Sequence, residues 1–356
     1  MKKHNFSPGP GILPAEVIEQ AAAGALDLNG SGLSILEMSH RGKAVMQIFE
    51  EAVSLMREVA GLPDDFEVLF CTGGASQQFA MAPMNLLNDD ETAGYVDTGV
   101  WASKAIKEAR LFGNVQVLGT SKPDNYNNIP RGWHIPDNLR YIHMTSNNTI
   151  YGTQQNWWPE TTVPIVCDMS SDFLSRPIDF SKFGLVYAGA QKNIGAAGVT
   201  IVLVRKDMLG FVRRNIPSMF DYRSYIENDN MYNTPPVFAV YVSMLVLRWL
   251  RDRGGLVATD LYNQRKAAVL YDAVDKSSIF KGTTAKKDRS LMNPCFVMED
   301  PTKEAEFLQF AQANGVMDIK GHRSVGGFRA SMYNAMPIES VEFLVQLMAE
   351  FERTKA

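Results

Sequence analysis

Seven short runs rich in β-branched and aromatic residues alternate with helical or loop segments between residues 66 and 204. The runs cover residues 66–70, 94–97, 115–118, 140–144, 164–168, 184–188 and 199–204. Strands separated by helical segments are typical of a mostly parallel sheet that is covered by helices on both faces. In such sheets ligands collect beyond the carboxyl ends of the strands. The pattern therefore predicts an α/β fold with a seven-stranded sheet and directs attention to the residues that follow each strand.

A change in sequence pattern near Gly254 and Gly255 predicts a second lobe. Downstream lie a long helical segment at 256–274, a strand at 295–298, a helix at 302–314, a strand-like stretch around Phe328 and a closing helix at 338–353. A mixture of helices and strands of about 100 residues is a usual size for a small domain. We expect a large domain over residues 16–255 and a smaller α+β domain formed by residues 1–15 together with 256–356.

Composition excludes several classes of function. The net charge is -4 and the basic residues are scattered, which argues against a nucleic-acid partner. No run reaches the ~20 apolar residues of a membrane span, and the first residues lack an apolar leader, so we expect a cytoplasmic protein without a membrane partner. Cys71, Cys167 and Cys295 lie far apart in apolar runs, which is typical of reduced core thiols rather than of disulfides or a metal site.

A single lysine, Lys192, stands among small residues in the stretch Tyr187–Gly198, between two predicted strands. Small residues let the backbone approach a ligand closely and leave the amine poorly hydrated. A desolvated lysine has a lowered pKa and becomes a nucleophile toward carbonyl carbons. On this stretch alone, a turn lysine that points into water is an equal alternative.

Features upstream of Lys192 predict a pyridoxal-phosphate (PLP) site. Asp168 ends the run 164–168, about two dozen residues before the lysine, the spacing at which PLP enzymes place a carboxylate on the pyridine nitrogen. An aspartate that caps the following turn is the alternative. The glycine-rich turn 71–79 offers N–H groups to a phosphate and matches neither a Walker loop nor the dinucleotide fingerprint. Trp101, which follows another strand, could stack on a flat ring or belong to the core.

Further motifs stand in order along the whole chain. They are Asn5–Pro10, Glu37–Arg41, Gly73–Ser76, Trp101, Thr149, Asp168–Ser171, Ala190–Asn193, Tyr232–Pro236 and Gly321–Ser331. With this series the chain resembles the phosphoserine aminotransferases, which are class V PLP enzymes of fold type I. The resemblance implies amino-group transfer between O-phospho-L-serine and 2-oxoglutarate, giving 3-phosphohydroxypyruvate and L-glutamate in serine biosynthesis. It also allows a side activity in pyridoxine synthesis.

The resemblance implies roles for individual residues. Lys192 would hold the cofactor as a Schiff base, Asp168 would contact the pyridine nitrogen, and Trp101 would stack on the ring. Cofactor contacts are also implied for Ala75, Ser76, Thr149 and Gln191, and for Asn233 and Thr234 on the cofactor of the neighbouring subunit of a homodimer. Arg329 is implied to bind the substrate α-carboxylate, and His40, Arg41, His322 and Arg323 the distal phosphate or carboxylate.

The distal group is physically reasonable, with one departure from the family pattern. Guanidinium groups bind phosphate in a bidentate manner, and we expect the imidazoles to add charge-assisted donors. Some members carry an arginine where this sequence has Ser76, which puts a third distal arginine in doubt. His4, His134 and His143 have no comparable partner in the sequence and are interpreted as structural.

Alternative functions remain open at the level of the sequence. Another class V aminotransferase would share most of these residues. A cysteine desulfurase needs a mobile, reactive cysteine, whereas Cys295 lies in a run that is typical of a buried strand. A catalytically silent binding or scaffold protein would be expected to have lost the chemical residues, yet Lys192, Asp168 and Arg329 are all present.

Overall fold

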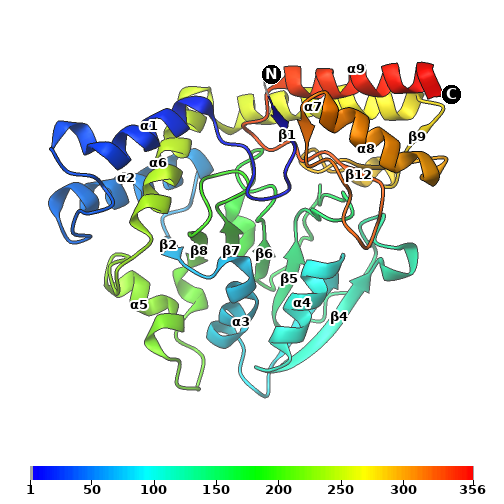
Figure 1. Cartoon of the computed structure of the whole chain (residues 1–356). Helices are drawn as coiled ribbons and strands as arrows, with labels where there is room; N and C mark the ends of the chain where they lie inside the picture. Colours follow the sequence, from blue (N-terminus) through cyan, green and yellow to red (C-terminus); the bar gives the residue numbers. More distant parts are fainter. Residues whose placement is uncertain (1–2, 356) are drawn as a thin grey trace.

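The computed structural model describes residues 3–355 and contains one large sheet and two smaller ones (Figure 1). The large sheet has seven strands in the order β2-β8-β7-β6-β5-β3-β4. Its strands are β2 (Phe66–Cys71), β3 (Thr92–Asp97), β4 (Asn114–Thr120), β5 (Leu139–Thr145), β6 (Ile165–Asp168), β7 (Phe183–Gly189) and β8 (Thr200–Arg205). Each corresponds to one of the predicted runs, so the predicted α/β fold with a seven-stranded sheet is confirmed.

Strand direction places six strand ends at one edge of this sheet. The strand β8 is antiparallel to both of its neighbours, β2 and β7. The remaining neighbours pair in parallel, with Thr145 opposite Asp168 and Asp168 opposite Tyr187 at the ends of β5, β6 and β7. The carboxyl ends of all strands except β8 therefore meet along the same edge, where ligands of such sheets bind.

Helices cover both faces of the large sheet (Figure 1). One layer holds α1 (Ala15–Leu26), α2 (Lys43–Ala60) and α6 (Val237–Asp252), and the other holds α3 (Gly74–Leu86), α4 (Val100–Ala109) and α5 (Tyr222–Glu227). Alternate residues of β2 point to opposite layers, since Val68 packs in the first core and Leu69 in the second. Burial on both faces is the reason why these strands are almost continuously apolar.

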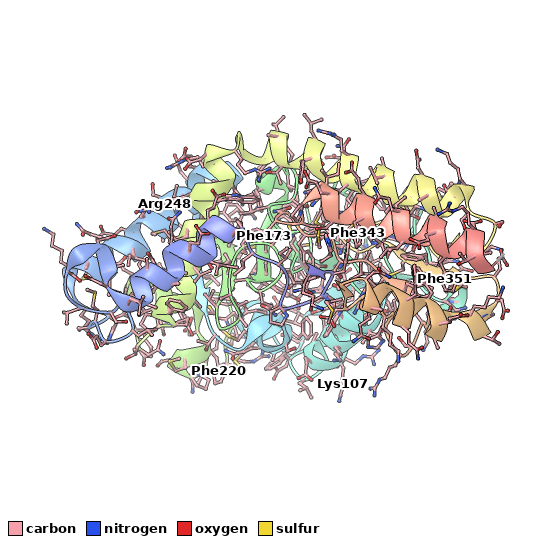
Figure 2. The ribbon with its side chains drawn as sticks, turned by 45° about the horizontal axis from the view of Figure 1, so that its top comes forward. Lys107, Phe173, Phe220, Arg248, Phe343 and Phe351 are labelled. Atoms are coloured by element: carbon pink, nitrogen blue, oxygen red, sulfur yellow. The ribbon has the colours of Figure 1, made fainter. Side chains whose placement is uncertain are left out.

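An ion pair links two helices of the first layer. Arg248 of α6, labelled in Figure 2, donates from Nε and Nη2 to the carboxylate of Glu51 in α2, at 2.5 and 2.6 Å. Both side chains are more than a third exposed, so the pair adds little stability.

The helices α1, α2, α5 and α6 have no counterpart among the predicted elements.

A separate core forms around the C-terminal segments. The helices α7 (Gly255–Lys276), α8 (Glu304–Ala313) and α9 (Ile338–Lys355) pack with the sheet β12-β10-β9, whose strands are Phe328–Arg329, Cys295–Met298 and Phe280–Gly282. In this core Phe351 of α9, labelled in Figure 2, packs against Phe307 with ring centroids 5.2 Å apart. The predicted C-terminal helices and strands are confirmed, except that α8 begins at Glu304, after the 3-10 turn Pro301–Lys303.

The N-terminal residues lie with the C-terminal lobe. The strand β1 (His4–Asn5) pairs in parallel with β11 (Val316–Met317), and the buried Phe6 belongs to the C-terminal core. The predicted domain boundaries themselves stay a prediction. None of the helices within residues 3–355 has the length and apolarity needed to cross a membrane.

Candidate active site

A cavity of about 470 Å³ opens at the carboxyl edge of the large sheet. The segments that follow β2, β3, β5, β6 and β7 all contribute to it, as do the N-terminal segment and the C-terminal lobe. The predicted site residues that line it are Ala75, Ser76, Trp101, Thr149, Asp168, Gln191, Lys192, His322 and Arg329. Residues that are spread over more than two hundred positions of the sequence thus share one space.

Lys192 follows β7 and faces this cavity rather than bulk water. Its Nζ donates a hydrogen bond to Thr149 Oγ1 at 2.9 Å. Burial lowers the pKa of Lys192 to about 8; the charge of Asp168 opposes this shift and that of Arg329 adds to it. Near physiological pH, a much larger fraction of this amine is therefore neutral than in an exposed lysine, and a neutral amine is the nucleophilic form.

Asp168 ends β6 at the floor of the same cavity and is only 5% exposed. Its Oδ1 accepts the backbone N–H of Ser170 at 2.9 Å, so the aspartate caps the following turn and lines the cavity at once. Burial raises the pKa of this carboxyl, partly offset by hydrogen bonds from Ser170 and by the charge of Lys192. A buried carboxylate of this kind is stabilised by a further cationic donor, which a protonated pyridine nitrogen would provide.

The glycine-rich turn presents a helix N-terminus to the cavity. Gly73 precedes α3 with φ +81°, and a Cβ there would lie 1.8 Å from Gln77 Oε1, so only glycine fits. No side chain caps α3, which leaves the first N–H groups of the helix available to an anion. Ala75 and Ser76 belong to this first turn and line the cavity.

Trp101 lies in the first turn of α4, after β3. Its ring centroid is 6.0 Å from Lys192 Nζ, and its buried Nε1 has no hydrogen-bond partner. The indole is half-buried and forms one wall of the cavity, so it is available to a flat ring that lies beside the lysine.

Arg329 brings a buried positive charge to the cavity from the C-terminal lobe. The residue is 7% exposed, its Nη1 donates to the carbonyl oxygen of Thr149 at 3.1 Å, and its Nε has no partner. Burial lowers the pKa of this guanidinium, which has no carboxylate partner within residues 3–355. A desolvated, unpaired guanidinium is suited to bind a carboxylate of a ligand.

The cavity fits PLP in its donor and acceptor groups. Free N–H groups at the start of α3 suit a phosphate, Trp101 suits the ring face, Asp168 suits the ring nitrogen, and the desolvated Lys192 suits the aldehyde carbon. The site thus has a partner for the phosphate, the ring nitrogen and the aldehyde of the cofactor.

Comparisons with known proteins agree with this geometry. The family described as aminotransferase class-V matches residues 3–344 of the chain. The chain belongs to this family. It is 52% identical over 353 residues to the phosphoserine aminotransferase of Flavobacterium psychrophilum, and the match covers 99% of both chains.

Solved structures of the family share the fold along their whole length. The phosphoserine aminotransferase of Bacillus circulans subsp. alkalophilus superposes with a TM-score of 0.97 and 46% identity, over 100% of this chain and 99% of that one. The PLP-bound phosphoserine aminotransferase of Trichomonas vaginalis superposes with a TM-score of 0.93 and 38% identity, over 98% of this chain and 100% of that one. This chain therefore shares the fold of these structures over nearly its whole length.

The resemblance also assigns roles to several residues that do not line the cavity of about 470 Å³ in their own chain. His40 and Thr234 line a second cavity of about 630 Å³, and Arg41 Nε donates to His40 Nε2 at 3.2 Å. Arg323 is exposed, and neither it nor Asn233 lines either cavity. A single chain therefore does not bring the pair at 40–41 together with the pair at 322–323.

His322 lines the cavity and accepts a local hydrogen bond. Its Nδ1 accepts the backbone N–H of Ser324 at 3.2 Å, so the neutral ring carries its proton on Nε2. Burial lowers the pKa of His322, and the charges of Arg329, Arg323 and Lys104 lower it further. A neutral imidazole N–H that donates to a phosphate is still a charge-assisted donor, because the phosphate is charged, so the expected role of His322 stays a prediction.

Sequence reasoning missed several residues that build the site. Pro8 and Gly9 lie over Lys192, and the backbone N–H of Gly11 donates to the carbonyl oxygen of Gln191 at 2.7 Å. Asn147 follows β5 and donates to Ser171 Oγ at 2.8 Å. Asn147 and Ser171 could have been identified from the sequence because each lies just after a strand. No local pattern, by contrast, indicates that the N-terminal segment crosses the site.

The cysteines are all buried and free. Burial raises the pKa of both Cys71 and Cys295 to about 12, and that of Cys167 well above its usual value. The predicted core thiols are confirmed. A desulfurase needs an accessible thiolate, so the structure does not favour that alternative.

Proposed function

We propose that this class-V protein is a phosphoserine aminotransferase of serine biosynthesis. It transfers the amino group between O-phospho-L-serine and 2-oxoglutarate, giving 3-phosphohydroxypyruvate and L-glutamate, with PLP as cofactor. The observation that carries the proposal is the whole-length identity of 52% to a phosphoserine aminotransferase. The desolvated Lys192 and the unpaired Arg329, which line the same cavity, support it.

In this proposal, some residues of the cavity hold the cofactor and others hold the substrate. Bound PLP supplies an aldehyde that condenses with amines and a ring that withdraws electrons from the substrate α-carbon. The N–H groups of Ala75 and Ser76 bind its phosphate, together with the side chain of Gln191. Asp168 keeps the ring nitrogen protonated, and Trp101 covers one face of the ring.

Lys192 is the proton carrier at the substrate α-carbon. With a pKa of about 8, its Nζ can accept the α-proton in its neutral form and, once charged, would donate a proton on the cofactor side, as amino-group transfer requires. Thr149 Oγ1 accepts a hydrogen bond from this amine and orients it. Arg329 binds the α-carboxylate, which fixes the α-carbon relative to Nζ.

The active unit that we propose is a homodimer with shared sites. Asn233 and Thr234 lie away from the cavity of their own chain, and Thr234 lines the second cavity with His40. Exposed apolar side chains surround that region, among them Leu33 (50% exposed) and Leu36 (67%). Grouped exposed apolar residues favour association. In a dimer, these polar residues would reach the cavity of the partner, as would Arg41.

Two further proposals accompany this function. The enzyme acts in the cytoplasm, and its acceptance of a phosphorylated hydroxythreonine gives a side activity in pyridoxine synthesis. Both follow from the family resemblance of the motifs, and the second is tested by adding that compound to a substrate panel.

A substrate panel tests the main proposal. Phosphoserine and serine are compared as amino donors to 2-oxoglutarate, with glutamate formation as the measurement. We expect kcat/KM for phosphoserine to exceed that for serine by at least about 30-fold, because a desolvated charge pair is worth about 2 to 5 kcal/mol. The Lys192→Ala variant is the control without turnover. Equal rates with both donors, or release of sulfur from cysteine, would contradict the proposal.

A further inference from the structure

Lys104 lies beside the wall of the cavity that Trp101 forms. It is exposed and belongs to α4, one turn after the tryptophan, so the two side chains share a face of the helix. Lys104 Nζ is 4.6 Å from the centroid of the Trp101 ring, and Lys192 Nζ is 6.0 Å from the same centroid. Both amines therefore lie near the same ring, and Lys104, which does not itself line the cavity, lies beside its rim.

The opposite side of this rim belongs to the C-terminal lobe. His322 lines the cavity, and the charge of Lys104 contributes to lowering its pKa, after burial and the charges of Arg329 and Arg323. Lys104 is therefore close enough for its charge to influence a charged group at the opening of the cavity. Within the described residues 3–355, no carboxylate forms an ion pair with Lys104, so its charge is available to a ligand.

Within a single chain, few positively charged residues are left for a distal phosphate, in addition to the Arg41 that the proposed dimer would bring from the partner. His322 is neutral near neutral pH, and the glycine-rich turn presents the uncharged Ser76. Arg329 is engaged by the α-carboxylate under the proposed function. Of the cations near the mouth in the same chain, Arg323 and Lys104 remain, and they act on His322 from different elements.

We propose that Lys104 is a specificity-determining residue, whose ammonium group at the rim binds the distal phosphate of the substrate. This inference rests on the proposed function, because it assigns a contact to the phosphate of phosphoserine. A compact, strongly hydrated ammonium group on a flexible stem can reach a phosphate from an exposed position and bind it as a point charge.

The test compares two variants of the PLP-loaded enzyme with a matched control. Lys104→Gln removes the charge and keeps most of the length of the side chain, whereas Lys104→Arg keeps the charge. Lys107→Ala removes an exposed charge from the same helix, at the edge of the molecule in Figure 2. Measurements are kcat and KM for phosphoserine and for serine, the inhibition constant of inorganic phosphate, and PLP affinity.

We expect Lys104→Gln to raise KM for phosphoserine about tenfold and to weaken inhibition by phosphate by a similar factor. Its kcat, its activity with serine and its PLP affinity should stay near the wild-type values. Lys104→Arg should restore most of the loss, and Lys107→Ala should behave as wild type. An unchanged preference for phosphoserine in Lys104→Gln would overturn the inference, as would an equal loss with both donors, which indicates a structural role through Trp101.

The imidazole of His322 gives a readout that does not depend on turnover. The chain has only five histidines, so the ring can be assigned by NMR from a His322→Gln variant. Removing the nearby cation in Lys104→Gln should raise the pKa of His322, whereas Lys107→Ala should leave it unchanged. A wild-type enzyme without preference for phosphoserine would refute the proposed function itself, whereas an unshifted His322 would refute only the placement of Lys104.

Discussion

At the scale of single residues, burial decides the chemistry of the site. An exposed lysine has a pKa of about 10.4, whereas burial lowers that of Lys192 to about 8. The same burial raises the pKa of Asp168, and the opposite charges of the two residues moderate both shifts. The same residue types on the surface would be a solvated ion pair without catalytic use.

The pKa of Lys192 predicts how capture of the cofactor depends on pH. Because the folded-state pKa is lowered, the neutral amine becomes abundant at a lower pH than in an exposed lysine. We expect the rate at which the cofactor-free protein captures PLP to rise about tenfold per pH unit below pH ~8 and to level off above it. The measurement is the change in cofactor absorbance after mixing, between pH 6.5 and 9.5. The Lys192→Ala variant should give no such change, and a rate still rising steeply at pH 9.5 would contradict the assignment.

At the scale of elements, the site depends on where strands end and helices begin. Three of the key groups follow parallel strands directly: the N-terminus of α3 after β2, Trp101 after β3 and Lys192 after β7. The side chain of Asn193 ties the lysine loop in place, since its Nδ2 donates to Ser171 O at 3.2 Å and its Oδ1 accepts from Asn334 N at 3.0 Å. Rigid elements thus hold flexible side chains at fixed separations.

The turn before α3 gives a prediction at this scale. In Gly73→Ala, the added methyl group meets Gln77 and the residue keeps a positive φ, which costs about 1 to 2 kcal/mol. We expect the first turn of α3 to shift and the affinity for PLP to fall about tenfold, measured by titrating the cofactor-free protein. The double variant with Gln77→Ala removes the contacts with Oε1 and Cδ of Gln77, leaves the one with its Cβ, and keeps the cost in φ. It should recover part of the affinity, and an affinity for PLP that is unchanged in Gly73→Ala would contradict the assignment of this turn to the phosphate.

At the scale of the whole molecule, the cavity combines parts that are remote in the sequence. Arg329 and His322 come from the C-terminal lobe, and Pro8 and Gly9 from the N-terminal segment that pairs with it. These contributions place the substrate side of the cavity between the lobes and the cofactor side on the large sheet. A change in the arrangement of the lobes would therefore move the substrate groups relative to Lys192.

The shared sites of the proposed homodimer are tested with mixed dimers. One chain carries Lys192→Ala and the other Thr234→Ala, so a shared arrangement leaves one complete site, formed by Lys192 of one chain and Thr234 of the other. We expect that site to bind PLP with wild-type affinity, whereas Thr234→Ala homodimers should bind about 10- to 100-fold more weakly, as loss of a hydrogen bond to a charged group predicts. Titration of purified mixed dimers with PLP gives both values. If cofactor binding instead followed each chain independently, the sites would lie within single chains.

The sequence alone determined the seven strands, the mostly parallel sheet and the chain order of Gly73, Trp101, Asp168 and Lys192. These features depend on local periodicity and on the rule that strand ends gather at one edge, so they need no knowledge of packing. The separate C-terminal segments were predictable for the same reason.

Only the tertiary structure decided the direction of β8, the crossing of the site by Pro8 and Gly9, and the neutral state of His322. It also separated His40 from His322 and placed Lys104 beside Trp101. Each of these depends on contacts between residues far apart in the chain, or on burial that such contacts create. Local patterns fix which face of an element is apolar, whereas the charge and reach of a polar side chain depend on what the fold packs against it.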